Sequence, residues 1–334
     1  MKILVIRRDN IGDLVCTTPV FASLRQAFPE AYIAALVNSY SAPVISNNPD
    51  INSVFTYTKG KHGANEQGVI RRWITSFALL RKLRADQFDV VIAINKSSVS
   101  LARLLSPKRI ISAGNLAGPD IISEHDIAPL HAVEAAHKFL TPLGIHSAPG
   151  SLSIYPDLNR LKPNLHPASQ KPVIGLHLSS RKPSQRWSVE NFISLANKLS
   201  SAREISFRVF WSPGTQSNPL HPGDDEKAEC FIQATKHLPV EFCATTQLGE
   251  LITAMSLCDL MICGDGGAMH IAAALGKPVV ALFGDSEPKR WHPWGVPHQV
   301  LQPFSRNVTD ITPEDVLLAS LPLLDLTHPA TRHE

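Results

Sequence analysis

The feature of this sequence that most constrains its fold is an alternation of short apolar runs with longer segments of helical periodicity. The first run, Ile3 to Ile6, is followed by a polar turn and then by a helical stretch over 14–28. Short continuous apolar runs are typical of strands that are buried on both faces, as in parallel sheets. The alternation therefore predicts an α/β fold with doubly wound parallel sheets and helices on both faces.

The alternation occurs in two halves, which a segment of different composition separates. Prolines fall at positions 149, 156, 163, 167 and 172, among serine, asparagine and histidine residues, and this composition is typical of a linker. A length of 334 residues also fits two domains better than one. The predicted organisation is a first domain over 1–150, a linker over 151–172, a second domain over 173–311, and a C-terminal helix and tail over 312–334.

The periodicity predicts the following elements. In the first half we expect strands at 3–6, 32–37, 89–94 and 109–112, and helices at 14–28, 70–83, 98–105 and 132–143. In the second half we expect strands at 173–178, 205–211, 240–243, 260–263 and 279–283, and helices at 189–199, 224–236, 248–256, 268–275 and 313–324.

Composition argues against several classes of protein. A formal net charge of only +3 argues against a nucleic-acid partner. The apolar start is ended by Arg7 too early for a signal peptide, and no apolar run is long enough to span a membrane. The five cysteines form no Cys-x-x-Cys pair and are expected to be reduced, buried thiols in the cytoplasm. The histidines are not at metal-ligand spacing, so no metal site is expected.

Ligands of open parallel sheets bind at the carboxyl ends of the strands, so the loops that follow strands are the candidate sites. The first such loop is Arg7-Arg8-Asp9-Asn10-Ile11-Gly12-Asp13, which leads into a helix N-terminus. Asp13 is a candidate general base. The alternative is that the Asp13 carboxylate caps the helix.

The second candidate loop is Cys263-Gly264-Asp265-Gly266-Gly267-Ala268-Met269-His270. Its glycines allow a phosphate to approach the backbone, and the following helix start favours a diphosphate. His270 lies within the first helical turn, near the same anion. The alternative is a tight turn with a core histidine. The spacing matches neither the dinucleotide-binding nor the Walker motif, so an NAD enzyme and a P-loop ATPase are poorly supported.

The third candidate loop, 177–187, combines hydroxyl groups with cations that suit a diphosphate, namely Ser179, Ser180, Lys182 and Arg186. The alternative is a solvated basic loop. In the acidic run 224–226, Asp225 is a candidate ligand for a ribose hydroxyl. Acidic residues are also favoured at a plain helix N-terminus, which is the alternative for this run.

Two sets of motifs resemble a known family. They are Ile11-Gly12-Asp13, Thr18-Pro19 and Leu24-Arg25 with Phe28-Pro29 near the N-terminus, and the run from Asp265 through His270 to Gly276-Lys277-Pro278. Together, and in this order, they resemble the lipopolysaccharide heptosyltransferases of glycosyltransferase family nine, and the similarity spans nearly the whole chain. The resemblance implies a GT-B fold, in which two Rossmann-like domains face each other across a cleft. The N-terminal domain of that fold holds the acceptor, and the C-terminal domain holds the nucleotide sugar.

The resemblance also implies an activity. It is inverting, metal-independent transfer of a heptose from ADP-L-glycero-D-manno-heptose to the inner core of lipopolysaccharide or a related acceptor, with no cofactor. Asp13 matches the general base of the family. The donor-binding positions are then Ser179, Ser180, Lys182, Arg186, Asp225, Asp265, Gly266, Gly267 and His270, and the acceptor-binding positions are Arg7, Arg8, Asn10 and Gly12.

Two departures from the family concern the donor. Gly266 stands where some members have threonine, and Gln185 stands where some have lysine, so Arg186 or Lys182 would supply that charge. Two alternatives stay open: a non-catalytic paralogue that binds a sugar nucleotide or glycolipid, and a transferase or epimerase that uses another nucleotide sugar. The expected location is the cytoplasm, with peripheral contact to the cytoplasmic face of the inner membrane left open.

Overall fold

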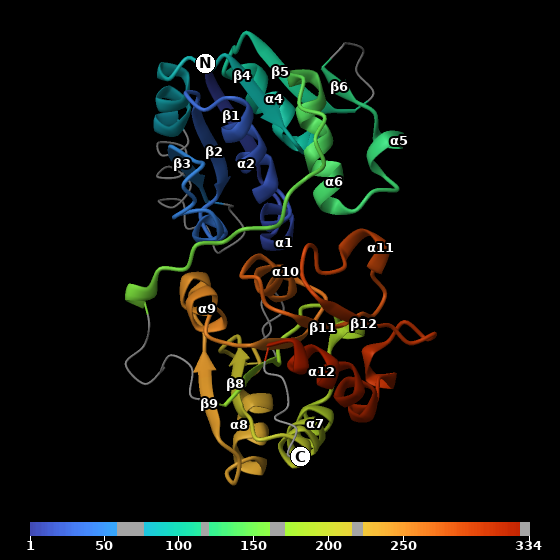
Figure 1. The fold of residues 1–334 in the computed structure, drawn as a ribbon. Helices are drawn as coiled ribbons and strands as arrows, with labels where there is room; N and C mark the ends of the chain where they lie inside the picture. The colour runs from blue at the N-terminus through green and yellow to red at the C-terminus, as the bar shows by residue number, and fades with distance from the viewer. Residues whose placement is uncertain (59–76, 115–119, 161–170, 216–222, 328–334) are drawn as a thin grey trace. The chain divides into compact units, whose positions relative to one another are not determined.

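The computed structural model describes residues 1–58, 77–114, 120–160, 171–215 and 223–327. The chain divides into two compact units, Met1–Tyr155 and Pro156–Glu334. Each unit contains one six-stranded sheet with helices packed against it (Figure 1). The segments 59–76, 115–119, 161–170, 216–222 and 328–334 lie outside the described residues, and so do the predicted helical residues 70–76 and parts of the predicted linker and tail.

The sheet of unit 1 is parallel throughout and has the strand order β3-β2-β1-β4-β5-β6. Its strands are β1 (Lys2–Arg7), β2 (Tyr32–Asn38), β3 (Ser53–Tyr57), β4 (Val90–Ala93), β5 (Arg109–Ala113) and β6 (Ile121–Ile122). In the centre of the sheet, Val5 of β1 lies between Ala35 and Ile92 in register. The continuous apolar run in β1 therefore reflects a strand that is buried on both faces.

The helices of unit 1 are α1 (Ile11–Val15), α2 (Thr18–Ala27), a helix over 77–85, α4 (Val99–Leu104), α5 (Glu124–Ile127) and α6 (Ala132–His137), with 3-10 turns at Ala42–Val44, Lys96–Ser98 and Lys138–Leu143. Leu4 and Ile6 of β1 pack in one core cluster with Leu83 and Ala102. Alternate residues of a strand face opposite sides, so the neighbouring buried residues of β1 face the other layer.

The sheet of unit 2 is also parallel and has the order β12-β11-β10-β7-β8-β9. Its strands are β7 (Val173–His177), β8 (Ser206–Trp211), β9 (Val240–Ala244), β10 (Leu260–Gly264), β11 (Val279–Leu282) and β12 (His298–Leu301). In both units, the first strand and the fourth strand along the chain lie side by side in the centre. This is the doubly wound order of Rossmann-like domains.

The helices of unit 2 are α7 (Val189–Ala202), α8 (Asp225–Ala234), α9 (Leu248–Met255), α10 (Gly267–Ala274), α11 (Pro288–Trp291) and α12 (Pro313–Thr327), with 3-10 turns at Leu158–Arg160, Pro183–Gln185 and Val308–Asp310. Leu195 of α7, Phe231 of α8 and Leu324 of α12 pack in one core cluster with Ile174 of β7. The prediction of an α/β fold with two doubly wound, Rossmann-like domains is confirmed.

The continuous helix predicted over 14–28 is wrong, because the structure has two helices there, α1 and α2. In one continuous helix, the amide of residue 19 would donate to the carbonyl of Val15, but Pro19 has no N–H. The Thr18 hydroxyl donates to the Val15 carbonyl instead, at 2.8 Å. Pro19 then occupies the second position of α2, where no intrahelical donor is needed.

The helix predicted over 132–143 is correct only to His137, after which the chain continues as a 3-10 turn. Pro142 lacks the N–H that an α-helix would require at this point. The predictions also missed β3, β6, β12, α5 and α11. These elements are short and only partly buried, so they lack the continuous apolar run that identified the central strands.

Two further expectations from composition can be compared with the structure. Cys16, Cys243, Cys258 and Cys263 are buried free thiols, as expected, but Cys230 is exposed, so that part of the prediction is wrong. Cys230 lies on the outer face of α8, which the predicted helix boundaries alone did not indicate. Within the described ranges, no helix is both long and apolar enough to cross a bilayer.

Candidate functional site

The strand order of each sheet identifies where a ligand would bind. In unit 1 the order changes direction between β1 and β4, and in unit 2 it changes between β7 and β10. Open α/β sheets bind ligands at such a switch point, beyond the carboxyl ends of the strands. The candidate loops after β1, β7 and β10 all lie at these two switch points. The segment after β4, beginning at Asn95, belongs to the same edge of unit 1.

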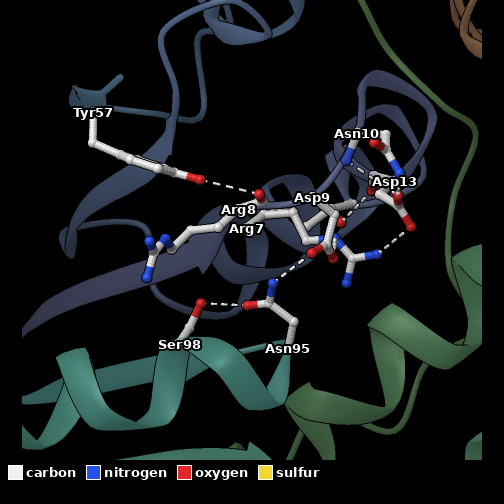
Figure 2. Close-up of polar contacts among 9 residues, drawn as sticks. Arg7, Arg8, Asp9, Asn10, Asp13, Tyr57, Asn95 and Ser98 are labelled. Carbon is white, nitrogen blue, oxygen red and sulfur yellow. Dashed lines mark hydrogen bonds and ion pairs between the residues drawn. The ribbon is translucent and has the colours of Figure 1, made fainter. Parts of the chain in front are cut away.

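Asp13 is held by three hydrogen bonds within its own unit (Figure 2). Arg7 Nη2 donates to Asp13 Oδ1 at 2.8 Å, and the backbone N and side-chain Nδ2 of Asn10 each donate to Asp13 Oδ2 at 3.2 Å. The bond from Asn10 N caps α1, so Asp13 does cap this helix, and its role as a general base stays a prediction. The Asp13 side chain is 17% exposed, and each carboxylate oxygen has two lone pairs. Oδ1 therefore retains the capacity to accept a further proton or hydrogen bond.

The two arginines of this loop have different partners. Arg7 Nε lies 3.3 Å from Asp9 Oδ2, so the Arg7 guanidinium pairs with both Asp9 and Asp13. The Arg8 guanidinium stacks on the Tyr57 ring, 4.5 Å from its centroid, while the Tyr57 hydroxyl donates to the Arg8 carbonyl at 3.0 Å. Arg8 makes no ion pair with any residue that the structure describes. Its charge is therefore the one available to an anionic ligand.

Gly12, the fourth residue predicted to bind the acceptor, lies inside α1. Its carbonyl accepts the hydrogen bond from Cys16 N at 2.9 Å. This bond closes the short helix that carries Asp13. The structure thus brings Arg7, Asn10, Gly12 and Asp13 together around one helical turn.

In unit 2, Gln185 connects two loops at the switch point. Gln185 Nε2 donates to Asp265 Oδ2 at 2.9 Å and to Ser286 Oγ at 2.8 Å. Burial raises the pKa of the Asp265 carboxyl, and the hydrogen bond from Ser286, the charge of Lys182 and the bond from Gln185 oppose this rise only in part. A neutral amide therefore stands beside this carboxylate, at the position where the family resemblance led us to expect a lysine in some members.

The predicted basic loop after β7 is ordered by contacts to its neighbours. Ser179 Oγ accepts from Ser212 N at 2.9 Å, and Arg186 Nε donates to the Ser180 carbonyl at 2.9 Å. Lys182 Nζ lies 3.4 Å from Asp285 Oδ1, and both side chains are about half exposed. Arg186 Nη2 is buried and has no hydrogen-bond partner among the described residues. This nitrogen is a donor from which an anionic ligand could accept a hydrogen bond.

The glycine-rich loop after β10 leads directly into α10. The helix begins at Gly267, one residue earlier than predicted. A Cβ at Gly266 would meet nothing within 4 Å, so the space above this helix start is open within the unit. His270 is only 2% exposed, and its ring lies edge-on to Trp291 with 5.9 Å between the centroids. This packing is what the alternative of a core histidine predicts, and contact with a ligand stays a prediction.

The acidic run before α8 has two carboxylates in different settings. Asp225 Oδ1 accepts from Trp211 Nε1, and Asp225 Oδ2 accepts from Gly214 N, each at 2.8 Å. Asp224 is 6% exposed, and its Oδ2 has no partner in the part of the chain that the structure describes. Asp224 therefore has a buried oxygen without any hydrogen bond, whereas each Asp225 oxygen already accepts one. Sequence reasoning could not separate them, because the choice depends on the direction of each side chain.

Lys227 is a further candidate residue that sequence reasoning missed. Its Nζ donates to the carbonyls of Leu178 and Trp187, each at 2.7 Å, and so ties α8 to the loop after β7. Burial lowers the pKa of Lys227 to about 8. A cavity of about 370 Å³ lies beside it, between the starts of α7 and α8, and Arg186 and Asp224 are among its lining residues. The only signal in the sequence was a lysine in the first turn of a helix, where the dipole disfavours cations.

A metal centre was not expected from the sequence. Over the described segments of both units, no group of three or more histidine, cysteine, aspartate or glutamate side chains could hold a metal ion. The candidate site residues of unit 2 are cations, hydroxyl groups, carboxylates, a histidine and backbone N–H groups, and those of unit 1 are a carboxylate with arginines and an asparagine.

Comparisons with known proteins agree on one family. The family model described as glycosyltransferase family 9 (heptosyltransferase) matches residues 76–310. Lipopolysaccharide heptosyltransferase 3 of Escherichia coli is 26% identical over 295 residues, which cover 85% of this chain and 83% of the relative. Lipopolysaccharide heptosyltransferase 2 of Salmonella typhimurium is 25% identical over 347 residues, which cover 95% and 97% of the two chains.

A solved structure extends the agreement to the fold. The structure of E. coli ADP-heptose lipopolysaccharide heptosyltransferase II superposes with a TM-score of 0.76 at 22% sequence identity, covering 97% of this chain and 98% of that one. The expected GT-B fold is thereby confirmed.

Proposed function

The chain belongs to glycosyltransferase family 9, the heptosyltransferases, and from that premise we propose that it transfers heptose from ADP-L-glycero-D-manno-heptose to the inner core of lipopolysaccharide or a related glycan. The observation that carries this proposal is the similarity to lipopolysaccharide heptosyltransferases 2 and 3 along most of the chain. The name of the solved relative supports ADP-heptose as the donor. The protein is a glycosyltransferase, and the identities of its donor and acceptor are what we propose.

We assign donor binding to unit 2. The diphosphate lies on the N-terminus of α10, over Gly266 and Gly267, where backbone N–H groups and the helix dipole favour negative charge. Arg186 donates its unpartnered Nη2 to the diphosphate, and Ser179, Ser180 and Lys182 surround it. Negative charge grows on the departing ADP, and donors that are already fixed in place stabilise it in the transition state.

We revise one assignment within the donor site. Asp225 uses both carboxylate oxygens to hold Trp211 and Gly214. We therefore assign the ribose hydroxyl to Asp224, whose Oδ2 is buried and has no partner among the residues described. A buried, unpaired acceptor is costly, and a hydroxyl donor would remove that cost.

We assign acceptor binding and proton transfer to unit 1. Asp13 Oδ1 accepts the proton of the acceptor hydroxyl, and the deprotonated oxygen attacks the anomeric carbon of the heptose. The new C–O bond forms as the bond to the ADP oxygen breaks on the opposite face, so the anomeric configuration inverts. Arg8 binds a phosphate or carboxylate of the acceptor, because Arg7 is already paired within the unit. We propose that no bound metal takes part in this step.

The experiment that tests this proposal measures ADP release from ADP-heptose in the presence and absence of a lipopolysaccharide acceptor that lacks heptose. We expect acceptor-dependent release, and we expect Asp13→Ala to lower kcat by about 10²–10⁴-fold with little change in the KM for the donor. Glu314→Gln, a surface change in α12, is the control. Transfer from a UDP-linked sugar but not from ADP-heptose would refute the assignment of ADP-heptose as the donor. An unchanged kcat in Asp13→Ala would refute the assignment of Asp13 as the general base.

A further inference from the structure

A continuous series of polar contacts crosses the switch point of unit 1 and ends on Asp13 (Figure 2). It starts at Ser98 in the turn after β4 and passes through Asn95, Asp9 and Arg7. Asn95 Nδ2 donates to Asp9 Oδ1 at 2.5 Å, although the two residues are 86 positions apart in the sequence. The series thus joins the carboxyl ends of the two central strands, β1 and β4.

The direction of each contact is determined by chemistry. A carboxylate accepts but does not donate, so the Asn95 amide presents its nitrogen to Asp9 and its oxygen to the Ser98 hydroxyl, which donates to it. The second oxygen of Asp9 lies 3.3 Å from Arg7 Nε, and Arg7 Nη2 donates to Asp13 at 2.8 Å. The contact between Asp9 and Arg7 Nε is an ion pair without a hydrogen bond, whereas the other contacts of the series are hydrogen bonds.

The far end of the series lies at a buried residue. Ser98 is fully buried, and its backbone N donates to the Asn95 carbonyl at 2.9 Å. Asn95 is held against the 3-10 turn Lys96–Ser98, which leads into α4. Asp9 is thus held by a side chain from the turn after β4, and Ser98 is the buried residue of that turn.

Arg7 needs such support to hold Asp13 in one place. An arginine side chain has several rotatable bonds and loses rotamer entropy when it is fixed. Here the guanidinium is 12% exposed and pairs with a carboxylate on each side. Among the described residues, Asp9 is the ion-pair partner that Arg7 has besides Asp13, so loss of Asp9 removes the second carboxylate that holds the guanidinium.

We propose that Asp9 and Asn95 are positioning residues for acceptor deprotonation, acting through Arg7 on the Asp13 carboxylate. This inference rests on the proposed function, in which Asp13 is the base. A displacement of about 1 Å in a catalytic group can cost about 100-fold in rate. The proposal also gives Arg7 a positioning role within the unit, which leaves Arg8 as the arginine that binds the acceptor.

The test is a set of double-mutant cycles with purified full-length protein, ADP-heptose and the heptose-free lipopolysaccharide acceptor. Asp9→Asn and Asn95→Ala are each made in the wild type and in Asp13→Ala, and kcat and the donor KM are measured under single-turnover and steady-state conditions. We expect each single change to lower kcat by about 10- to 100-fold, with the donor KM unchanged. In the Asp13→Ala background the same changes should have no further effect, because their target is absent.

The control is Glu124→Gln, which removes the exposed ion pair with Lys96 beside Asn95 without touching the series. It should retain the wild-type kcat. Asn95→Asp is a second probe of the same contact, because it places a like charge against Asp9 and should reproduce the loss in kcat. Melting temperature and ADP binding are measured to show that each variant is folded, and only folded variants are interpreted. Asn95→Ala changes no formal charge, whereas Asp9→Asn and Asn95→Asp each do.

The outcomes separate the two claims. The inference would be overturned if Asp9→Asn or Asn95→Ala lowered kcat in the Asp13→Ala background by the same factor as in the wild type. A change in the donor KM in place of a change in kcat would also overturn it. Wild-type kcat in Asp9→Asn and Asn95→Ala, with Asp13→Ala impaired, would overturn the inference alone. Wild-type kcat in Asp13→Ala would overturn the base assignment and the inference together.

Discussion

Gly284, which follows β11, approaches the backbone of another loop so closely that no side chain fits. A Cβ at Gly284 would lie 2.3 Å from the Ser184 carbonyl oxygen and 2.9 Å from its carbon. Non-bonded carbon atoms are most favourable at roughly 3.5–4.0 Å, so Gly284→Ala must displace backbone rather than a flexible side chain. The displaced segment is the turn Pro183–Gln185, which carries the amide that joins Asp265 to Ser286.

The size of the effect follows from the cost of overpacking. Extra atoms in a well-packed region typically cost about 1–3 kcal/mol. For a unit of this size, each kcal/mol lowers the melting temperature by roughly 2–4 °C, so Gly284→Ala should melt about 2–12 °C below the wild type. Because Gln185 moves with the turn, we also expect weaker binding of ADP, which the donor site would hold through its diphosphate.

The assay is a thermal melt with and without ADP, alongside Gly150→Ala as the matched control. A Cβ at Gly150 would meet nothing within 4 Å, so this variant should melt with the wild type. If Gly284→Ala were as stable as the wild type and bound ADP equally well, the close approach would not constrain this loop. An equal fall in melting temperature in Gly284→Ala and Gly150→Ala would show that the effect does not depend on the contact with Ser184.

Two further predictions concern charge in unit 2. Because burial raises the pKa of Asp265, the folded state binds its proton at higher pH than the unfolded chain, so stability falls as pH rises above the ordinary carboxyl value of 3.8. Asp265→Asn should therefore be more stable than the wild type at pH 7 in urea titrations, with a difference that vanishes in acid, and a pH-independent difference would contradict this. Glu241→Gln removes the carboxylate that pairs with Arg208, a side chain that is 1% exposed and also donates to the Ala254 carbonyl. The change should cost about 3 kcal/mol in the same titrations, the lower end of the range for a buried pair because Glu241 is 35% exposed. Glu314→Gln breaks the exposed pair with Lys198 and should cost less than about 1 kcal/mol, and similar costs for the two variants would refute the role of burial.

The central strands could be predicted because burial on both faces leaves a direct record in the sequence. Ile3 to Ile6 is apolar at every position, and the structure places it between two neighbouring strands. The edge strand β12, His298–Leu301, has no such record, because its side chains are only partly buried. The break between α1 and α2 was missed although Pro19 is visible in the sequence, because the Thr18 hydroxyl that takes over the Val15 carbonyl is a local contact that periodicity does not reveal.

The loops of the site were predictable from the order of elements, since every candidate loop follows a strand of a parallel sheet. Which side chains in those loops are already hydrogen-bonded within the protein was decided only by the tertiary structure. Asp224 and Asp225 are adjacent and chemically identical, and they differ because Trp211 and Gly214 occupy the oxygens of one of them. The contact between Asp9 and Asn95 depends on strand order, which brings together residues that are far apart in the chain. Local periodicity encodes burial and therefore the elements, whereas hydrogen-bond partners depend on distances and directions that exist only once the sheet has formed.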